Sequence, residues 1–235
     1  MDSLSSRATG VAVALDESES KQVLRAYGIT TPAETLVTSR AAAIEAAERI
    51  GYPVVLKAVS AELIHKSEVG AVALDLADPE QLFAAYDRMA QRLERHRLTG
   101  MLVCRQIRGG LELVLGLHRD PEMGLVVMAG SGGVLLELIK DVTFCAPPVS
   151  ADKARDMLAR MRGAKLLAGY RGTAAHDVGA LINALVALGR LAVELEDLVQ
   201  SVDINPFVAL PQGGLALDAL IVLQRQPNAD RSASP

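Results

Sequence analysis

Within about twenty residues the chain changes from a pattern typical of a helix to one typical of a buried strand. Residues 39–50 are rich in strong helix formers, and Ser39 can cap their first turn. Gly51 can end this helix, and Pro53 forbids its continuation. The run VVLKAV at 54–59 is apolar apart from one lysine, which predicts a strand. Such an order of elements excludes a simple helix bundle.

The same alternation continues through most of the chain. Two last strands, 201–210 and 215–223, are joined by PQGG, a typical turn sequence. Only the first dozen residues and the last ten have the polar composition of loose tails. Further helices are predicted at 17–27, 79–96, 151–161 and 177–198, and further strands at 72–76, 101–107, 111–117 and 124–130.

Composition excludes several classes of protein. Half of the 235 residues are apolar, which is enough for a substantial core. The 24 Lys and Arg are interspersed with 28 Asp and Glu, so there is no basic stripe for a nucleic acid. Cys104 and Cys145 lie in apolar runs without metal-ligand spacing, and we expect both to be buried free thiols. No apolar run is long enough to span a membrane, so we expect a soluble cytoplasmic protein.

Lys57 is the first residue that suggests chemistry. It follows the apolar run VVL, where a buried ammonium is costly unless an anion lies beside it. A ligand phosphate is one such anion. An ordinary ion pair or an exposed strand end explains the residue equally simply, and from this lysine alone the simpler explanations are slightly favoured.

The final hairpin carries polar residues that suggest a metal site. Asp203 and Asn205 lie two apart on a predicted strand and therefore share a face, and Asp218 follows on the returning strand. Asn205 and Asp218 would offer hard oxygen ligands to Mg²⁺, which prefers few carboxylates together with substrate phosphates. Alternatively, Asp203 and Asn205 only hydrogen-bond the turn around Pro206, and spacing leaves the two interpretations even.

Two loops complete the set of candidates. GSGG at 130–133 could turn backbone N–H groups toward phosphate, although a plain tight turn explains so short a motif better. His65 lies in the polar segment HKSE before Gly70, where it could act as a mobile nucleophile that carries a group on a ring nitrogen. A solvated loop histidine is the alternative.

Taken together, several ordered motifs resemble one family. They are GYPVVLKAVSAELIHKSEVGAV, GLELVLGLHRDPEMGLVVMAGSGGVLLELIKDVTF, KLLAGYRG, and the ending DINPF with LDALIVL. In this order, from about Leu15 to Leu223, they resemble the ATP-grasp domain of nucleoside-diphosphate-forming acyl-CoA synthetases, in the form of the beta subunit of acetate–CoA ligases and succinyl-CoA synthetases.

The resemblance implies an α+β protein with the ATP-grasp fold, in which two α/β subdomains sandwich the nucleotide. It implies a first subdomain at 15–100 that carries the His65 loop and a second at 101–225 that carries the magnesium-binding hairpin. The tails are then 1–14 and 226–235. The implied reaction is reversible: acid, CoA and ATP give acyl-CoA, ADP and phosphate.

Roles for single residues follow from the same resemblance. His65 matches the carrier that ferries a phosphoryl group to ADP, and Lys57 matches the lysine that holds nucleotide phosphate. Asn205 and Asp218 match the magnesium ligands. The remaining matches are Val103, Arg105 and Ile107 in the hinge whose backbone meets adenine, and Glu112, Ser131, Gly132, Gly133 and the metal-side Glu137 around the phosphates.

Three residues depart from the family pattern. Arg105 stands where an acidic residue is common, Ala71 where a second glycine is common, and Cys145 where an arginine is common. Of these, Arg105 bears on the usual nucleotide contact, so it would alter nucleotide preference or weaken binding.

The resemblance also implies a partner. Because the chain lacks the CoA-binding and ligase domains, we expect a separate CoA-binding alpha subunit, in a heterotetramer, that brings the small carboxylic acid and CoA. Two alternatives stay open: another ATP-grasp ligase that joins a carboxylate to an amine, in which His65 has no covalent role, and a nucleotide-binding regulatory subunit.

Overall fold

The computed structural model describes residues 12–60, 69–133, 140–170, 172 and 174–224, and these residues group into two compact units. Unit 1 comprises the described parts of Met1–Leu15, Ser20–Thr30 and Gly110–Pro235, and unit 2 comprises those of Asp16–Glu19 and Thr31–Gly109. This grouping differs from the division expected between residues 100 and 101. The reason is that strand β5 (Gly100–Arg105) is hydrogen-bonded between two strands of unit 2.

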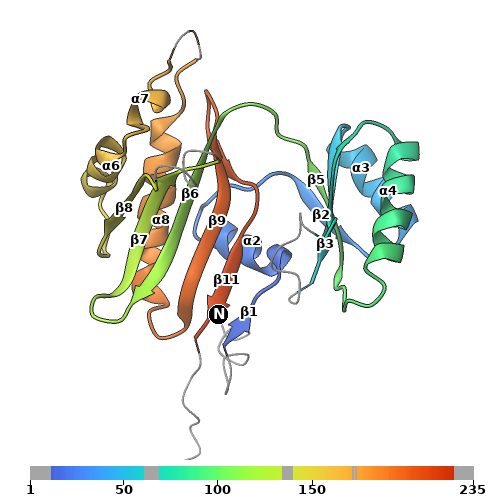
Figure 1. Cartoon of the computed structure of the whole chain (residues 1–235), viewed down its shortest axis with the longest axis horizontal. Coiled ribbons are helices and arrows are strands. Elements are labelled where there is room, and N and C mark those ends of the chain that lie inside the picture. The colour runs from blue at the N-terminus through green and yellow to red at the C-terminus, as the bar shows by residue number, and fades with distance from the viewer. Residues whose placement is uncertain (1–11, 61–68, 134–139, 171, 173, 225–235) are drawn as a thin grey trace, which may run out of the picture. The chain divides into compact units, whose positions relative to one another are not determined.

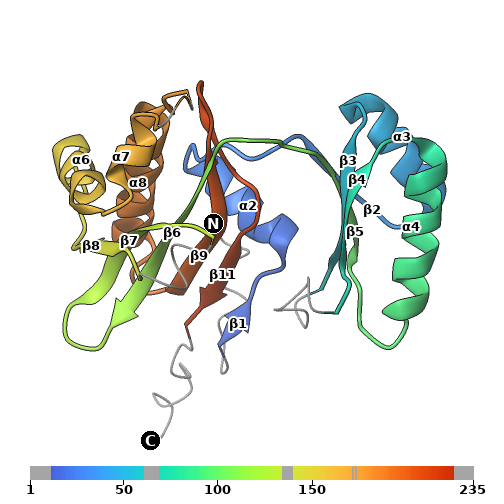
Figure 2. The same ribbon diagram turned by 45° about the horizontal axis from the view of Figure 1, so that its top comes forward.

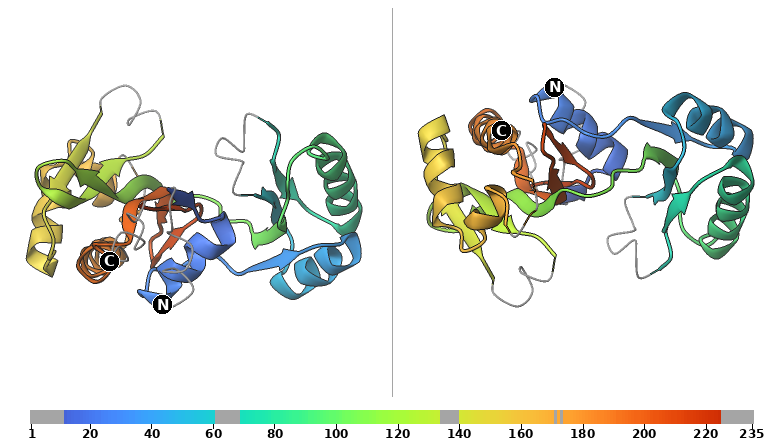
Figure 3. Two further views of the ribbon diagram at one scale, coloured as in Figure 1. Left: turned by 90° about the horizontal axis from the view of Figure 1, so that it is seen from below. Right: turned by 90° about the horizontal axis from the view of Figure 1, so that it is seen from above.

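Unit 2 is an antiparallel sheet with two helices on one face (Figure 1). Helices α3 (Arg40–Ile50) and α4 (Pro79–Arg92) lie side by side on that face, as both views of Figure 3 show. They bury alanines, Leu82 and Met89 against the sheet, so this side of the unit is a closed apolar core. In sheet order the strands are β2 (Glu34–Val37), β5, β3 (Val54–Val59) and β4 (Val72–Leu76).

The helix ends of unit 2 follow the sequence signals. The Ser39 side chain accepts a hydrogen bond from the N–H of Ala42, and Gly51 ends α3 with a φ of 89°. Both predicted strands, 54–59 and 72–76, are confirmed over the same residues. The helix predicted at 79–96 ends four residues early, at Arg92, because the chain turns at Leu93.

Unit 1 is a larger antiparallel sheet, with α8 (Val178–Glu194) packed along one face (Figure 2). Its core lies between that helix and alternate residues of the central strands, among them Leu113, Leu115 and Val127. Helices α2 (Glu17–Ala26), α6 (Ala151–Arg160) and α7 (Ala164–Leu167) complete the secondary structure around it. In sheet order the strands are β1 (Val13–Ala14), β11 (Leu220–Leu223), β9 (Val199–Ala209), β6 (Leu111–Asp120), β7 (Gly124–Ser131) and β8 (Val142–Cys145), and β10 (Gly214–Ala216) pairs with β9.

The final hairpin has the predicted form with one interruption. The turn closes through a hydrogen bond from the Leu210 N–H to the Gly213 carbonyl. The returning strand then pairs with β9 twice, first as β10 and then as β11, and residues 217–219 lie between the two pieces. The break contains Asp218, one of the two magnesium ligands expected from this hairpin.

Two expectations about single features can now be compared with the structure. Cys104 is buried in β5 as expected, whereas burial of Cys145 was wrong. Cys145 is only partly buried because it ends β8, the last strand in the order of its sheet. Among the helices of the described residues, none combines the length and apolar character that a membrane crossing requires.

Candidate functional site

Lys57 is a buried residue in the middle of unit 2. It is the fourth residue of β3, and only 9% of it is exposed. Its Nζ lies 2.7 Å from Oε1 of Glu17, whose side chain is fully buried at the start of α2. Glu17 thus supplies an anion beside the buried ammonium, as its desolvation requires. The ion-pair interpretation is confirmed, the exposed-strand-end interpretation is wrong, and phosphate binding by Lys57 stays a prediction.

Parts of the expected adenine hinge, residues 103–107, are already buried or hydrogen-bonded within unit 2. The Val103 side chain is fully buried in the helix-covered core, so only its main chain can face a ligand. The Arg105 N–H donates to the carbonyl of Ala33, and the Gln106 N–H donates to that of Pro53. The Arg105 side chain is exposed. These two N–H groups are therefore already satisfied within the protein, and adenine binding by this segment stays a prediction.

Ile107 lies in a stretch that is tied to the end of β4. On either side of it, Gln106 and Arg108 donate hydrogen bonds to Oδ1 of Asp75, over 2.7 and 2.6 Å. These two bonds hold the pKa of Asp75 below its ordinary value. Because Ile107 itself is only partly buried, it remains available at this edge of the unit.

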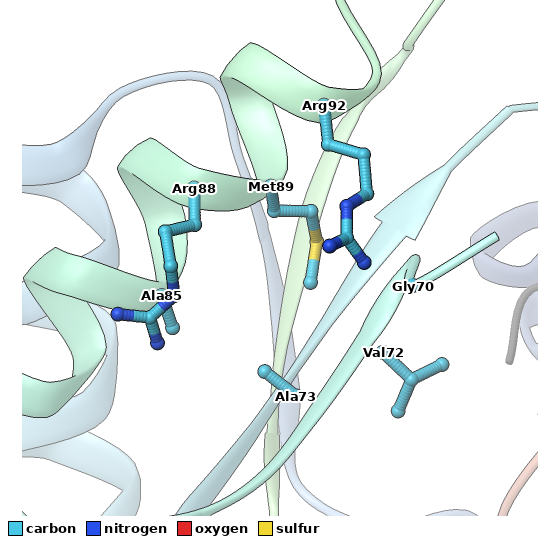
Figure 4. A pocket seen from close by; sticks show the side chains of 7 residues that line it. All are labelled: Gly70, Val72, Ala73, Ala85, Arg88, Met89 and Arg92. Atoms are coloured by element: carbon cyan, nitrogen blue, oxygen red, sulfur yellow. The ribbon is translucent and has the colours of Figure 1, made fainter.

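A separate cationic pocket of unit 2 lies between α4 and the start of β4 (Figure 4). Arg88 and Arg92, one helical turn apart, both reach toward β4, and Arg92 lies so close to Gly70 that a Cβ there would meet its Nη1 at 2.0 Å. None of the expected nucleotide or metal residues lines this pocket. The expected carrier His65 lies outside the described residues, as does Glu137.

In unit 1 one face of the sheet is rich in side-chain oxygens. Along β9, Val202 and Ile204 are buried on the α8 side, whereas Asp203 and Asn205 are exposed. The exposed Glu112 alternates in the same way with the buried Leu113 on β6. The expectation that Asp203 and Asn205 share a face is confirmed, and it is the face opposite the core.

Asp218 lies close to that face because the returning strand is interrupted there. The N–H of Leu217 donates to the carbonyl of Pro206, which ties the break to β9. The carboxylate of Asp218 also accepts the N–H of Ala219 over 2.8 Å. Asp203, Asn205 and Asp218, called the oxygen cluster below, therefore come from one hairpin.

The electrostatics of the oxygen cluster favour a cation. Although Asp203 remains open to solvent, desolvation by the surrounding protein and then the negative charge of Asp218 raise its pKa. A divalent cation would offset this repulsion, and Mg²⁺ suits a site with few carboxylates. Throughout the described part of the chain, no group of three or more His, Cys, Asp and Glu could hold a metal ion. Mg²⁺ would thus rely on the Asn205 amide and on oxygens from outside these residues, such as substrate phosphates.

The GSGG segment, residues 130–133 and called the glycine turn below, offers fewer amides than its sequence suggests. The Ser131 N–H donates to the carbonyl of Asp141, and the Gly132 N–H donates to that of Glu112. Gly133 has a φ of 58°, and no acceptor for its N–H occurs among residues that the structure describes. Among the described residues of this turn, the N–H of Gly133 could therefore be offered to a phosphate, whereas those of Ser131 and Gly132 could not.

Ser131 faces away from the oxygen cluster. It pairs with Leu113, whose side chain is in the α8-side core, and its hydroxyl donates to Oδ2 of Asp141 over 2.6 Å. A direct contact between this hydroxyl and a nucleotide therefore has no support in the geometry. Asp141 was missed in the sequence, where its place in the motif KDVTF was the available signal.

A second aspartate secures the hairpin itself. Asp177 caps α8 by accepting the N–H of Ala180 over 3.0 Å, and it also accepts the N–H of Gly213 over 2.8 Å. The N–H of Asp177 donates to the carbonyl of Leu210 in the same turn. The bonds that the carboxylate accepts, from Gly213 first and then from Ala180, lower the pKa of Asp177. Together with the main-chain bond to Leu210, they hold one end of the strands that carry the oxygen cluster.

Comparison with known proteins identifies the family. The sequence model of the ATP-grasp domain matches residues 7–223. The beta subunit of acetate–CoA ligase (ADP-forming) II from Pyrococcus furiosus is 34% identical over 217 residues, which are 90% of this chain and 92% of that protein.

Solved structures similar to this chain point to the same family. One of them is the dinucleotide-forming acetyl-coenzyme A synthetase 1 of Ca. Korarchaeum cryptofilum in complex with coenzyme A, Ca-AMPCP and HgCl+. It matches with a TM-score of 0.87 and 38% identity over 90% of this chain and 94% of that chain. Another structure of that enzyme, with Mg-AMPPCP and its phosphohistidine segment pointing towards the nucleotide site, gives a TM-score of 0.80 and 37% identity over 90% and 93% of the two chains.

These matches cover most of the chain and confirm both the expected fold class and the expected family. The chain belongs to the ATP-grasp family, as a beta-subunit-type domain of the ADP-forming acyl-CoA synthetases.

Proposed function

We propose that this chain is the nucleotide-binding subunit of an ADP-forming acid–CoA ligase, in which it passes a phosphoryl group between ATP and a carrier histidine. The observation that carries the proposal is the match to a separate beta subunit over 92% of that subunit's length. The oxygen cluster adds physical support, because it is a site where Mg²⁺ with a polyphosphate would be stable.

The predicted residues that the structure describes are assigned roles that fit their positions, and the role of Glu137, which lies outside the described residues, follows from the family resemblance alone. Asn205 and Asp218, together with Glu137, would hold Mg²⁺. Lys57 would neutralise phosphate charge, and its Nζ would then contact both the phosphate and the carboxylate of Glu17. Adenine would meet the backbone of residues 103–107, while Glu112 and the N–H of Gly133 would lie near the phosphates. For Ser131 and Gly132 the geometry supports only a role in shaping the glycine turn.

The chemistry asked of these residues is positioning and charge neutralisation. Phosphoryl transfer has little covalent work for the protein beyond the carrier itself, so fixed cations and amides contribute most of the stabilisation. In the transfer to His65, a ring nitrogen forms the new bond to phosphorus, the bond from the γ-phosphorus to the bridging oxygen breaks, and ADP leaves. The reverse transfer regenerates ATP.

The carrier role of His65 is tested by labelling. The purified chain is incubated with γ-labelled ATP and Mg²⁺, with and without a CoA-binding subunit, and acid-labile, base-stable label on the protein is measured. Label is expected in the wild type and absent in His65→Ala, and His96→Ala, which changes an exposed histidine of the same unit, is the matched control. Equal labelling of His65→Ala would contradict the carrier role.

The partner is an alpha subunit that binds CoA, by analogy with the relatives named as beta subunits. We propose a heterotetramer, with the acid and CoA bound by the alpha subunit. Light scattering of the co-purified complex measures the mass. A stable one-to-one dimer would contradict the tetramer without affecting the proposed phosphoryl transfer.

A further inference from the structure

Asp141 is a buried carboxylate that the proposed chemistry does not use. It precedes β8 directly and is 8% exposed. Its Oδ2 accepts the Ser131 hydroxyl over 2.6 Å and the Gly163 N–H over 2.8 Å, and its Oδ1 accepts the Arg162 N–H over 2.7 Å. Its own carbonyl accepts the N–H of Ser131. Asp141 thus joins the glycine turn to the segment between α6 and α7.

The negative charge of Asp141 is stabilised by hydrogen bonds from within the protein. Burial alone would raise its pKa, but the hydrogen bonds from Ser131, Gly163 and Arg162 and the Arg162 charge outweigh burial and lower it. Three donors on one carboxylate make strong, directional bonds. The carboxylate therefore acts through Ser131 and the two amides and has no need of a metal or ligand.

Close packing fixes the same turn from two sides. A Cβ on Gly163 would lie 2.4 Å from Oγ of Ser131, and a Cβ on Gly132 would lie 2.7 Å from the backbone of Glu112. No side chain fits at either position without displacing what it meets. The glycine turn is thus held between β6 on one side and the Asp141 network on the other.

The network continues to the hairpin that carries the oxygen cluster. Gly163 is the N-cap residue of α7. At the other end of that helix, Nδ1 of His176 lies within hydrogen-bond distance of the Leu166 carbonyl, and the N–H of His176 donates to the Leu167 carbonyl. The next residue, Asp177, accepts the N–H of Gly213 in the hairpin turn. The glycine turn, through Asp141, and the hairpin turn are therefore both hydrogen-bonded to the same segment of the chain, which leads from Gly163 to Asp177.

We propose that Asp141 is a positioning residue of the nucleotide site: it fixes the glycine turn so that Gly133 and Glu112 are presented to the phosphates bound beside the oxygen cluster. The inference rests on the proposed nucleotide binding. It assigns Ser131 an indirect role, as the link between Asp141 and the turn. If the N–H of Gly133 is no longer held in place, a nucleotide should bind less tightly through its phosphates. Adenosine, which has no phosphates, should be unaffected.

The test compares two ligands on the full chain. Binding of MgATP and of adenosine is measured by calorimetry for the wild type, Asp141→Asn and Ser131→Ala, and each variant's fold is checked by circular dichroism. We expect MgATP affinity to fall about tenfold in Asp141→Asn and less in Ser131→Ala, with adenosine affinity unchanged. Because Asp141→Asn removes charge, Gly163→Ala is included as a variant that keeps the Asp141 charge but crowds both Oγ of Ser131 and Oδ2 of Asp141, and it should weaken MgATP binding without changing adenosine binding.

Thr143→Val is the matched control, since the Thr143 hydroxyl donates to the Ala129 carbonyl on the same pair of strands but not to the glycine turn. It should leave both affinities unchanged. If every folded variant binds MgATP within twofold of the wild type, or loses MgATP and adenosine equally, the positioning role is overturned. If the wild type binds neither ligand, the proposed nucleotide binding fails as well, which separates the two failures.

Discussion

At the scale of single residues, mutation can separate two roles of Lys57: stabilising the fold through its ion pair with Glu17, and binding phosphate. Replacing Lys57 by Met removes the positive charge beside a buried glutamate, so unfolding should become easier by about 3 kcal/mol. The double variant Glu17→Gln, Lys57→Met removes both charges and should recover most of that stability. If Lys57 neutralises phosphate, both the single and the double variant should bind MgATP more weakly than the wild type. Denaturation and calorimetry measure the two effects, and MgATP affinity like that of the wild type in the double variant would contradict the ligand role.

Asp141 predicts a pH dependence of stability. Its pKa in the folded protein lies below the ordinary value of 3.8, so the folded state binds the proton less tightly than the unfolded state. The stabilisation is therefore fully present above pH 3.8 and is lost as the pH falls through the lower folded pKa. The difference in free energy of unfolding between the wild type and Asp141→Asn should be about 2 kcal/mol at pH 7 and should shrink below pH 3.8. Asp152→Asn, on the exposed surface of α6, is the control and should show a small difference throughout.

At the scale of elements, the final hairpin depends on a helix cap. Asp177→Ala removes acceptors for the N–H groups of Ala180 and Gly213, so the turn at 210–213 should open more often. Hydrogen exchange of the Gly213 amide should become faster by on the order of tenfold. Ser150→Ala removes a comparable cap from α6 without touching the hairpin, and it should leave that amide unchanged. Equal protection in Asp177→Ala would show that the hairpin turn is stable without this cap.

The elements also show which structure is predictable from sequence. Strands 54–59 and 72–76 were predicted with the observed bounds because apolar periodicity and flanking turn residues mark both ends. β1, β2 and β8 were missed, since strands of two to four residues exist mainly through their pairing with distant strands. The same limit applies to the site. Lys57 was recognisable as buried, but its partner Glu17 lies 40 residues away and could not be inferred.

At the scale of the whole molecule, the proposed function requires a second polypeptide. The chain alone, supplied with acid, CoA, ATP and Mg²⁺, should form no acyl-CoA, because the proposed function assigns the binding of acid and CoA to the alpha subunit. Addition of the alpha subunit should restore the reaction, and chelation of Mg²⁺ should abolish it. Mass spectrometry of the thioester product is the measurement, with heat-denatured alpha subunit as control. Acyl-CoA formation by the purified chain alone would contradict the two-subunit proposal.

The pairing of β1 with β11 has a consequence for how such a domain can be combined with others. Val13 lies opposite Leu223, so the first and last described strands run side by side in antiparallel register within unit 1. Chain entering before β1 and chain leaving after β11 therefore share one place on the domain surface. A domain built in this way can be joined to a neighbour at either end, inserted into another protein, or circularly permuted by a short linker, without any change to the strands between.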